Sequence, residues 1–246
     1  MDKILVIGDS CLDVYTYCKT SRLAPDKPVP VLEEIKTVSS PGMAYNVFRN
    51  VQSLTEDSYL LTNRNWQDIK KVRYVDEKSN HMFMRVDSPC EMEKVTVDEF
   101  SFDLETVKTI VISDYDKGFI SEEVIEYICS NHSQVFLDTK KVLGEWANNA
   151  KFIKINNHEY ERSKKYIDTH LDDKIIKTVG GEGCEYQGKL YPVKQKVEVL
   201  DVSGAGDTFM AALAVKYTDT YDIEVAIDTA NEYASQVVRH KGVTII

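Results

Sequence analysis

Residues 201–209, Asp201-Val-Ser-Gly-Ala-Gly-Asp-Thr-Phe209, place small residues and a carboxylate where a loop turns into a helix. Gly204 and Gly206 leave backbone N–H groups unshielded, and the apolar run that continues to Val215 predicts a helix whose partly positive N-terminus faces an anion. Asp207 would repel that anion unless it takes a proton from an attacking hydroxyl, so we interpret it as a general base of phosphoryl transfer. The alternative is an ordinary capped helix in which Asp207 complements the helix dipole.

The composition limits the classes of partner and the cellular compartment. Forty acidic against thirty basic residues give a net charge of −10, which disfavours nucleic acid and anionic membranes because both are bound by clustered Lys and Arg. Five cysteines without a C-x-x-C pair predict reduced thiols rather than a zinc site or a disulfide framework. No apolar run is long enough for a signal-peptide core or a membrane span. We therefore expect a cytoplasmic protein with one main domain over residues 1–246.

The pattern of apolar residues predicts an α/β fold. The run Ile4–Gly8 is typical of a buried parallel strand, and from residue 107 onward strands alternate with helices. This alternation predicts a central, mostly parallel sheet flanked by helices. Further strands are expected over 58–62, 69–76, 80–87, 109–113, 135–138, 152–155 and 174–179, helices over 42–54, 121–129 and 223–238, and a hairpin around 187–189.

A small β flap, or lid, is expected beside this sheet. Residues 14–18 and 29–37 have alternating, β-prone character and are interrupted by prolines between residues 25 and 30. Proline cannot donate to a ladder, so we expect both strands near an edge of a sheet. Together with the later strands they define lid segments over about 14–37 and 69–87.

Several phrases besides residues 201–209 carry a resemblance to a known family. They are Gly8-Asp9 with Asp13, Ser21-Arg-Leu-Ala-Pro-Asp-Lys-Pro-Val-Pro-Val31, Pro41-Gly42 with Asn46, Arg85-Val-Asp87 and Ser113-Asp-Tyr-Asp-Lys-Gly118. Over nearly the whole chain they resemble the ribokinase-like (PfkB) family of sugar kinases. Within that family the likeness is to the kinase domain that phosphorylates D-glycero-D-manno-heptose 7-phosphate at its anomeric hydroxyl. The resemblance implies an ATP-dependent, Mg²⁺-using sugar kinase of ribokinase-like fold.

The resemblance also implies roles on the sugar side of the site. Asp207 would be the catalytic base, and the amides of Gly204, Ala205 and Gly206 would form an anion hole for the transferred phosphoryl group. The sugar would be held by Asp9, Asp13, Gly42 and Asn46, with Arg85 and Lys117 among the cations available to a phosphate on the sugar. The alternatives are a strand-end cap for Asp9, a solvated loop position for Asp13 and a buried, satisfied amide for Asn46.

On the nucleotide side the resemblance implies a second group of residues. They are Lys140, Asn156, Thr178, Gly180, Gly183 and Asn231, beside which Glu159 would organise Mg²⁺ through water. Asn156 has an equally good alternative as the cap of the helix that follows residues 152–155.

The chain also departs from the family's pattern. Between Leu54 and Asp68 it lacks a glycine-rich strand–helix stretch, so we expect an exposed sheet edge. Met43 stands where the family has a second glycine, and we expect it to narrow or reshape the sugar pocket. No His-x-Gly-His nucleotidyltransferase signature is present.

Two rival functions stay open at this point: a kinase for another sugar or nucleoside, and a protein that binds a sugar phosphate without turning it over. A dinucleotide-binding oxidoreductase is disfavoured because the turn Gly8–Asp13 has no second or third glycine for a pyrophosphate. Because the flap strands of relatives often pair between subunits, we expect a homodimer through the lid.

Overall fold

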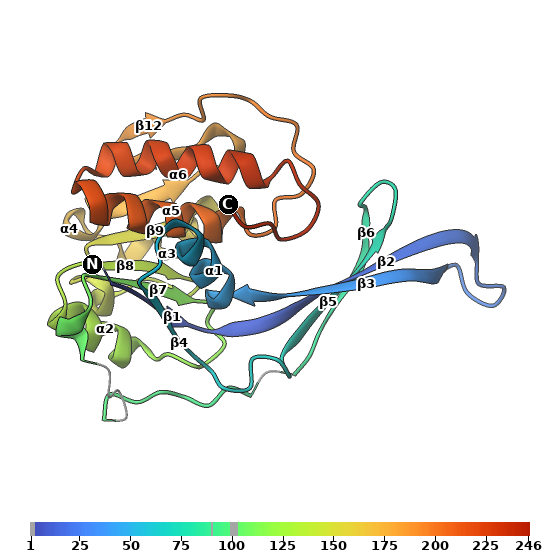
Figure 1. Ribbon diagram of the computed structural model, residues 1–246, viewed down its shortest axis with the longest axis horizontal. Coiled ribbons are helices and arrows are strands. Elements are labelled where there is room, and N and C mark those ends of the chain that lie inside the picture. Colours follow the sequence, from blue (N-terminus) through green and yellow to red (C-terminus); the bar gives the residue numbers. More distant parts are fainter. Residues whose placement is uncertain (1–2, 90, 99–102) are drawn as a thin grey trace.

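The computed structural model describes residues 3–89, 91–98 and 103–246, which form two β-sheets and the helices that cover the larger one (Figure 1). The strands of the large sheet are β1 (Ile4–Gly8), β4 (Ser58–Thr62), β7 (Thr109–Asp114), β8 (Val135–Thr139), β9 (Phe152–Asn156), β10 (Ile175–Thr178), β11 (Cys184–Tyr186) and β12 (Lys189–Tyr191). Those of the small sheet are β2 (Ser10–Leu23), β3 (Pro30–Met43), β5 (Lys70–Asp76) and β6 (Met82–Asp87). The α-helices are α1 (Ala44–Leu54), α2 (Glu122–Asn131), α3 (Asn157–Ser163), α4 (Thr169–Asp172), α5 (Ala205–Thr220) and α6 (Ile223–Val237).

The large sheet is mostly parallel. Its order is β12-β11-β10-β9-β8-β7-β1-β4, in which the strands from β10 to β4 run parallel and β11 and β12 add an antiparallel hairpin. This confirms the predicted α/β fold, with a separate small sheet as the lid. No helix in the described part of the chain is long and apolar enough to cross a membrane.

Both faces of the large sheet are covered, and β1 shows why. Ile4 and Val6 belong to the core cluster shared with α1, α5 and α6, whereas Leu5 and Ile7 belong to the cluster shared with α2. Because successive side chains of a strand point to opposite faces, four consecutive apolar residues supply both cores. A continuous apolar run is therefore what a doubly covered parallel strand requires.

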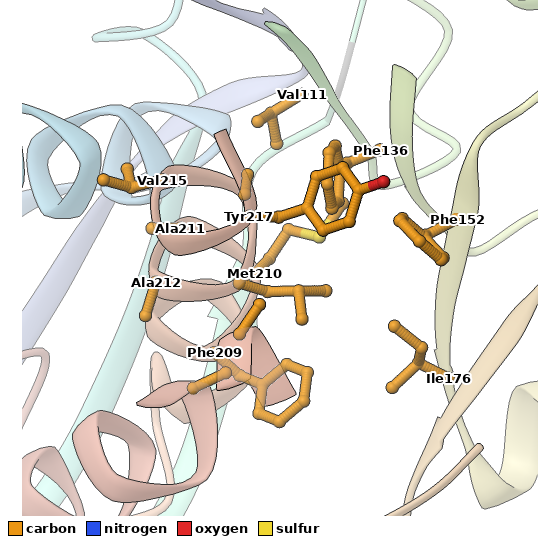
Figure 2. Close-up of a cluster of buried hydrophobic side chains, with 14 of the residues drawn as sticks. Val111, Phe136, Phe152, Ile176, Phe209, Met210, Ala211, Ala212, Val215 and Tyr217 are labelled. Atoms are coloured by element: carbon orange, nitrogen blue, oxygen red, sulfur yellow. The ribbon is translucent and has the colours of Figure 1, made fainter. Parts of the chain in front are cut away.

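Helix α5 is fixed against the sheet by aromatic contacts (Figure 2). The ring centroid of Tyr217 lies 5.0 Å from that of Phe152 and 5.6 Å from that of Phe136. Small side chains at Ala211 and Ala214 are fully buried in the same cluster. This packing fixes the direction of α5 and with it the position of the residues in its first turn.

The small sheet has the order β3-β2-β5-β6, and its first two strands are longer than predicted. The expectation that both lie near an edge was wrong for β2, which is an inner strand between β3 and β5. The prolines explain the difference: Pro25 and Pro28 lie in the turn between the strands, and Pro30 is the first residue of β3. None of them interrupts the ladder of β2.

The shortened segment after α1 leaves an edge of the large sheet open, as expected. Strand β4 is the last strand in the order and pairs with β1, and the side chain of Tyr59 on it is 41% exposed.

Phe136→Ala should lower the free energy of unfolding by about 3–5 kcal/mol, because it removes a fully buried ring from between Phe152 and Tyr217. Urea denaturation measures the change. Tyr166→Ala, at a ring that is 54% exposed, is the control and should stay within about 0.5 kcal/mol of the parent. Equal midpoints for Phe136→Ala and the parent would contradict this packing.

Candidate active site

Asp207 lies in the first turn of α5, and its carboxylate is held by two distant segments. The Asn46 amide of α1 donates to Oδ2 at 2.9 Å, and the Tyr115 hydroxyl, after β7, donates to Oδ1 at 2.5 Å. Asp207 is 7% exposed and Asn46 is fully buried. The structure therefore brings the predicted base and the predicted sugar ligand Asn46 together, and adds a residue that sequence reasoning did not assign a role.

The environment of Asp207 adjusts the basicity of its carboxylate. Burial raises the pKa of Asp207, and the hydrogen bonds from Tyr115 and Asn46 together with the charge of Lys154 offset part of that rise. The net pKa stays above the ordinary value of an aspartate. A raised pKa suits a carboxylate that has to accept a proton near neutral pH.

The glycines before Asp207 lie close to polar side chains of the site. Gly204 is the N-cap of α5 and adopts a left-handed conformation with φ 82°, and a Cβ there would lie 3.0 Å from the Asn46 amide nitrogen. A Cβ on Gly206 would lie 3.0 Å from the Lys154 ammonium nitrogen. A side chain at either position would therefore press on a neighbouring polar group of the site.

One amide of the predicted anion hole already has an acceptor within the protein. The Ala205 N–H donates to the Val202 carbonyl at 3.2 Å. The N–H groups of Gly206 and Asp207 lie in the first turn of α5, where an α-helix provides no acceptor of its own. These two amides are the better candidates to bind an anion.

A group of alternating charges lies at the ends of β8 and β9. The Lys154 ammonium is 2.7 Å from Asp138 Oδ2, and the Lys140 ammonium is 2.5 Å from Glu159 Oε1 and 3.6 Å from Asp138 Oδ1. Burial raises the pKa of Asp138, but Lys140 and Lys154 more than offset this and lower it. The pKa of Lys140 is raised: burial lowers it, and Asp138 and Glu159 outweigh that effect.

Sequence reasoning missed Lys154, although it carried a signal. Lys154 is 4% exposed and stands between Ile153 and Ile155 in a buried strand. A lysine in such a position is rarely buried unless it is paired. Its nearness to the Gly206 position would give the predicted anion site a second source of positive charge.

Asp9, the first predicted sugar ligand, binds backbone groups of the loop after β7. It is fully buried, and its carboxylate accepts hydrogen bonds from the N–H groups of Tyr115 at 2.7 Å, Phe119 at 3.1 Å and Lys117 at 3.4 Å. The carboxylate thus organises the loop that follows β7. This matches the strand-end capping alternative, and Lys117 itself is exposed on that loop.

Asp13 and Gly42 are brought together on neighbouring strands of the lid. A Cβ on Gly42 would lie only 2.0 Å from Asp13 Oδ2, so glycine leaves the space that the carboxylate occupies. Asp13 Oδ1 forms an ion pair of 2.5 Å with Arg73 on β5. Arg85, on β6, instead pairs with Asp87 at 2.8 Å and is 48% exposed.

Met43 does not line an open pocket. It is 3% exposed and packs with Cys11 and Ile69, and Tyr115 packs against this group. Its φ of 61° is unusual for a residue other than glycine, which explains why a glycine is the easier choice at this position.

Several of the predicted nucleotide residues share a cavity of about 360 Å³. Its lining includes Thr178, Gly180, Gly183 and Asn231, and it reaches Gly206 at the start of α5. The size is that of a small-molecule site. The Asn231 amide donates to the Tyr191 carbonyl at 2.9 Å, so this side chain also holds the wall of the cavity.

Asn156 and Glu159 form a reciprocal cap at the start of α3. Asn156 Oδ1 accepts from the Glu159 N–H at 2.9 Å, and Glu159 Oε2 accepts from the Asn156 N–H at 2.8 Å. Lys140 and Asn156 were also predicted on the nucleotide side, but neither belongs to the described lining of the 360 Å³ cavity. Glu159 Oε1 is directed to Lys140, which links the cap to the charged group.

Residues 89–246, more than half of the chain, match the pfkB family of carbohydrate kinases. This chain belongs to that family. The resemblance inferred from the motifs is thereby confirmed. Its similarity to solved structures shows the fold: a nucleoside kinase of Methanocaldococcus jannaschii has a TM-score of 0.73 at 20% identity, covering 99% of this chain and 93% of the other. A ribokinase of Thermotoga maritima has a TM-score of 0.71 at 16% identity, covering 99% and 95%.

Among curated proteins, this kinase is similar to proteins named bifunctional protein HldE. The one from Helicobacter pylori (strain HPAG1) is 28% identical over 296 residues, covering 98% of this chain and 64% of the relative. The one from Campylobacter jejuni (strain RM1221) is 29% identical over 285 residues, covering 98% and 62%. The kinase therefore spans less than two thirds of these relatives. Both alignments are longer than its 246 residues, so the relatives contain segments that it lacks.

Asn156→Ala should lower the free energy of unfolding by about 1 kcal/mol, because it removes the side-chain acceptor of the cap of α3. Asn156→Asp keeps an acceptor and should retain most of the stability. The shift of the urea midpoint measures both. An unchanged midpoint for Asn156→Ala would contradict a capping role for this side chain.

Proposed function

We propose that this carbohydrate kinase transfers the γ-phosphoryl group of ATP to the anomeric hydroxyl of D-glycero-D-manno-heptose 7-phosphate, giving the 1,7-bisphosphate. The observation that carries the transfer is the buried Asp207 carboxylate beside the amides at the start of α5. The heptose acceptor is supported by the similarity to proteins named HldE and by the family phrases at residues 21–31 and 113–118.

The proposed reaction is a direct transfer. Asp207 takes the proton of the acceptor hydroxyl while the hydroxyl oxygen forms a bond to the γ-phosphorus. The bond from the γ-phosphorus to the bridging oxygen breaks, and ADP leaves with that oxygen. The amides of Gly206 and Asp207 and the ammonium of Lys154 are placed to stabilise charge on the phosphoryl group as it moves.

Mg²⁺ fits this site as a hydrated ion. Asp138 Oδ1 is buried without a hydrogen-bond partner, and Lys140 lies between Asp138 and Glu159. The described residues contain no group of three His, Cys, Asp or Glu arranged to hold a metal. Mg²⁺ usually keeps several waters and binds to substrate phosphates, so Asp138 and Glu159 would hold it through water. When bound, it would neutralise charge on the β- and γ-phosphates.

The phosphate of the acceptor requires a cation of its own. Arg73 forms a 2.5 Å ion pair with the buried Asp13, whereas Arg85 on β6 pairs with Asp87 in a contact that is about half exposed, and Lys117 lies two residues after Tyr115 on the exposed loop after β7. Lys117 and Arg85 therefore stay our candidates for this role, with Asp13 accepting from the sugar hydroxyls.

We place the protein in the cytoplasm. In the described part of the chain Cys11, Cys18, Cys129 and Cys184 are buried free thiols. Burial raises the pKa of Cys11 to about 12, so this thiol stays protonated. Free, unpaired thiols are typical of a reducing compartment.

Asp207→Asn should fold normally but lose turnover by about 10²- to 10⁴-fold, because the amide cannot accept the proton. ADP release from Mg·ATP measures turnover with heptose 7-phosphate, fructose 6-phosphate, fructose and ribose offered in parallel. Fastest turnover with heptose 7-phosphate, abolished in the variant, is the expected result. Faster turnover with an unphosphorylated sugar would mean that this sugar, and not the heptose 7-phosphate, is the acceptor. Near-normal turnover by the variant would refute the role of Asp207 as the base.

We also propose a homodimer formed through the lid. Met84 and Val86 are each about half exposed and lie two residues apart in the regular part of β6, so they share one face of the small sheet; Met82, also about half exposed, lies beyond an irregularity in the pairing with β5.

Met84→Asp should shift the protein from dimer to monomer, because the dimer would bury this charge against apolar residues. Sedimentation velocity at micromolar concentration measures the mass. Val225→Asp, at a position 41% exposed on α6, is the matched control and should stay dimeric. A monomeric parent protein would refute the dimer.

A further inference from the structure

Tyr115 makes a hydrogen bond that the proposed reaction does not yet use. Its hydroxyl lies 2.5 Å from Asp207 Oδ1, while the Asn46 amide binds Oδ2. Each oxygen of the carboxylate therefore has one donor, and the two donors come from different sides of the site. Two ionised oxygens offer about four lone-pair positions, so an acceptor hydroxyl can still bind to the carboxylate.

The ring of Tyr115 is held from several directions. Its backbone N–H donates to Asp9 Oδ2 at 2.7 Å, and the ring packs on the apolar cluster that contains Met43. The ammonium groups of Lys71 on the lid and Lys140 after β8 lie 5.0 and 5.4 Å from the ring centroid. Moving the hydroxyl away from Asp207 would therefore disturb the loop, the lid contact and the nucleotide side together.

We propose that Tyr115 is a positioning residue, whose hydroxyl orients the Asp207 carboxylate toward the acceptor hydroxyl and keeps it ionised between turnovers. Tyr115 donates throughout and does not lose its own proton. This inference rests on the proposed role of Asp207 as the base. It gives the tyrosine of the segment Ser113–Gly118 a role at Oδ1 of Asp207 that complements the contact of Asn46 at Oδ2.

The direction of the expected effect follows from the charges around Asp207. Burial and the charge of Asp207 raise the pKa of Tyr115 well above its ordinary value, so the phenol stays a donor. The titratable groups that face Asp207 are Tyr115 after β7, Asp138 and Lys140 on and after β8, Lys154 on β9 and Cys11 on β2. Without the phenol, Asp138 and Lys154 remain, and the carboxylate loses a donor that lowers its pKa.

The test is Tyr115→Phe, which keeps the ring and its packing and removes only the hydroxyl. We expect kcat to fall by about tenfold to a hundredfold, the loss typical of one hydrogen bond to a charged group, with the KM for ATP little changed. The acidic limb of the kcat/KM profile should move to higher pH, because the base must be ionised to act. Tyr186→Phe, a buried tyrosine on β11, is the matched control and should leave both quantities unchanged.

A second measurement needs no acceptor. The titration of the Asp207 carboxyl can be followed by NMR with ¹³C-labelled aspartate, assigned by its loss in Asp207→Asn. Its midpoint should rise in Tyr115→Phe and fall when 3-fluorotyrosine, a stronger donor, replaces Tyr115. Opposite shifts support the proposal, and a midpoint that moves in neither protein overturns it.

The two proposals fail separately. Normal turnover of Asp207→Asn would remove the base and this inference with it. An inactive Asp207→Asn together with a Tyr115→Phe that matches the parent in kcat and pH profile would overturn the role of Tyr115 alone. In a protein that already carries Asp207→Asn, Tyr115→Phe should cause no further loss of kcat. A further loss as large as the one in the parent protein would mean that Tyr115 does not act through Asp207.

Discussion

The hydrogen bonds from Tyr115 and Asn46 to the Asp207 carboxylate join three segments that lie far apart in the chain. Removing a carboxylate from water is costly, and the cost is offset only where donors or opposite charges replace the water. Asp207 therefore depends on α1, on the loop after β7 and on the cation of Lys154 all being in place. The buried Asp207 carboxylate is therefore compensated only in the folded protein, when these segments lie together.

A second buried carboxylate supports the first. Asp9, at the end of β1, accepts three backbone N–H groups from the loop that carries Tyr115. Burial and the charge of Asp114 raise the pKa of Asp9, while these backbone donors lower it in part. Parallel strands end at the same edge of the sheet, so β1 and β7 place Asp9 and Tyr115 side by side. Asp9 thus helps to position the Tyr115 hydroxyl at Asp207 by holding the loop that carries Tyr115.

The nucleotide side and the lid meet at this same point. Asp138 lies between Lys140 and Lys154, so both ammonium groups are held within one network of ion pairs. The ring of Tyr115 contacts Lys140 on that side and Lys71 of the lid on the other. The ion pair of Arg73 with Asp13 and the narrow space beside Gly42 fix the part of the lid that is nearest to the large sheet in sequence, at the start of β2 and the end of β3. These contacts give the lid a defined position relative to the base.

Local pattern alone determined much of this protein. Apolar periodicity located β1, the alternating strands and helices, and the helix after the glycines, because burial on two faces requires continuous apolar strands. The glycine motif led to the prediction of Asp207 as the base and of an anion site beside it, since a free helix N-terminus has the same chemistry in any fold. The prolines led to the wrong prediction that β2 is an edge strand. Proline affects only its own position in the ladder, so it does not reveal which strand becomes the inner one. Only the tertiary structure decided that Asp9 holds a loop, that Lys154 lies beside Gly206 and that Tyr115 reaches Asp207. Each of these depends on contacts between residues 16 to 110 positions apart, and no local pattern encodes such distances.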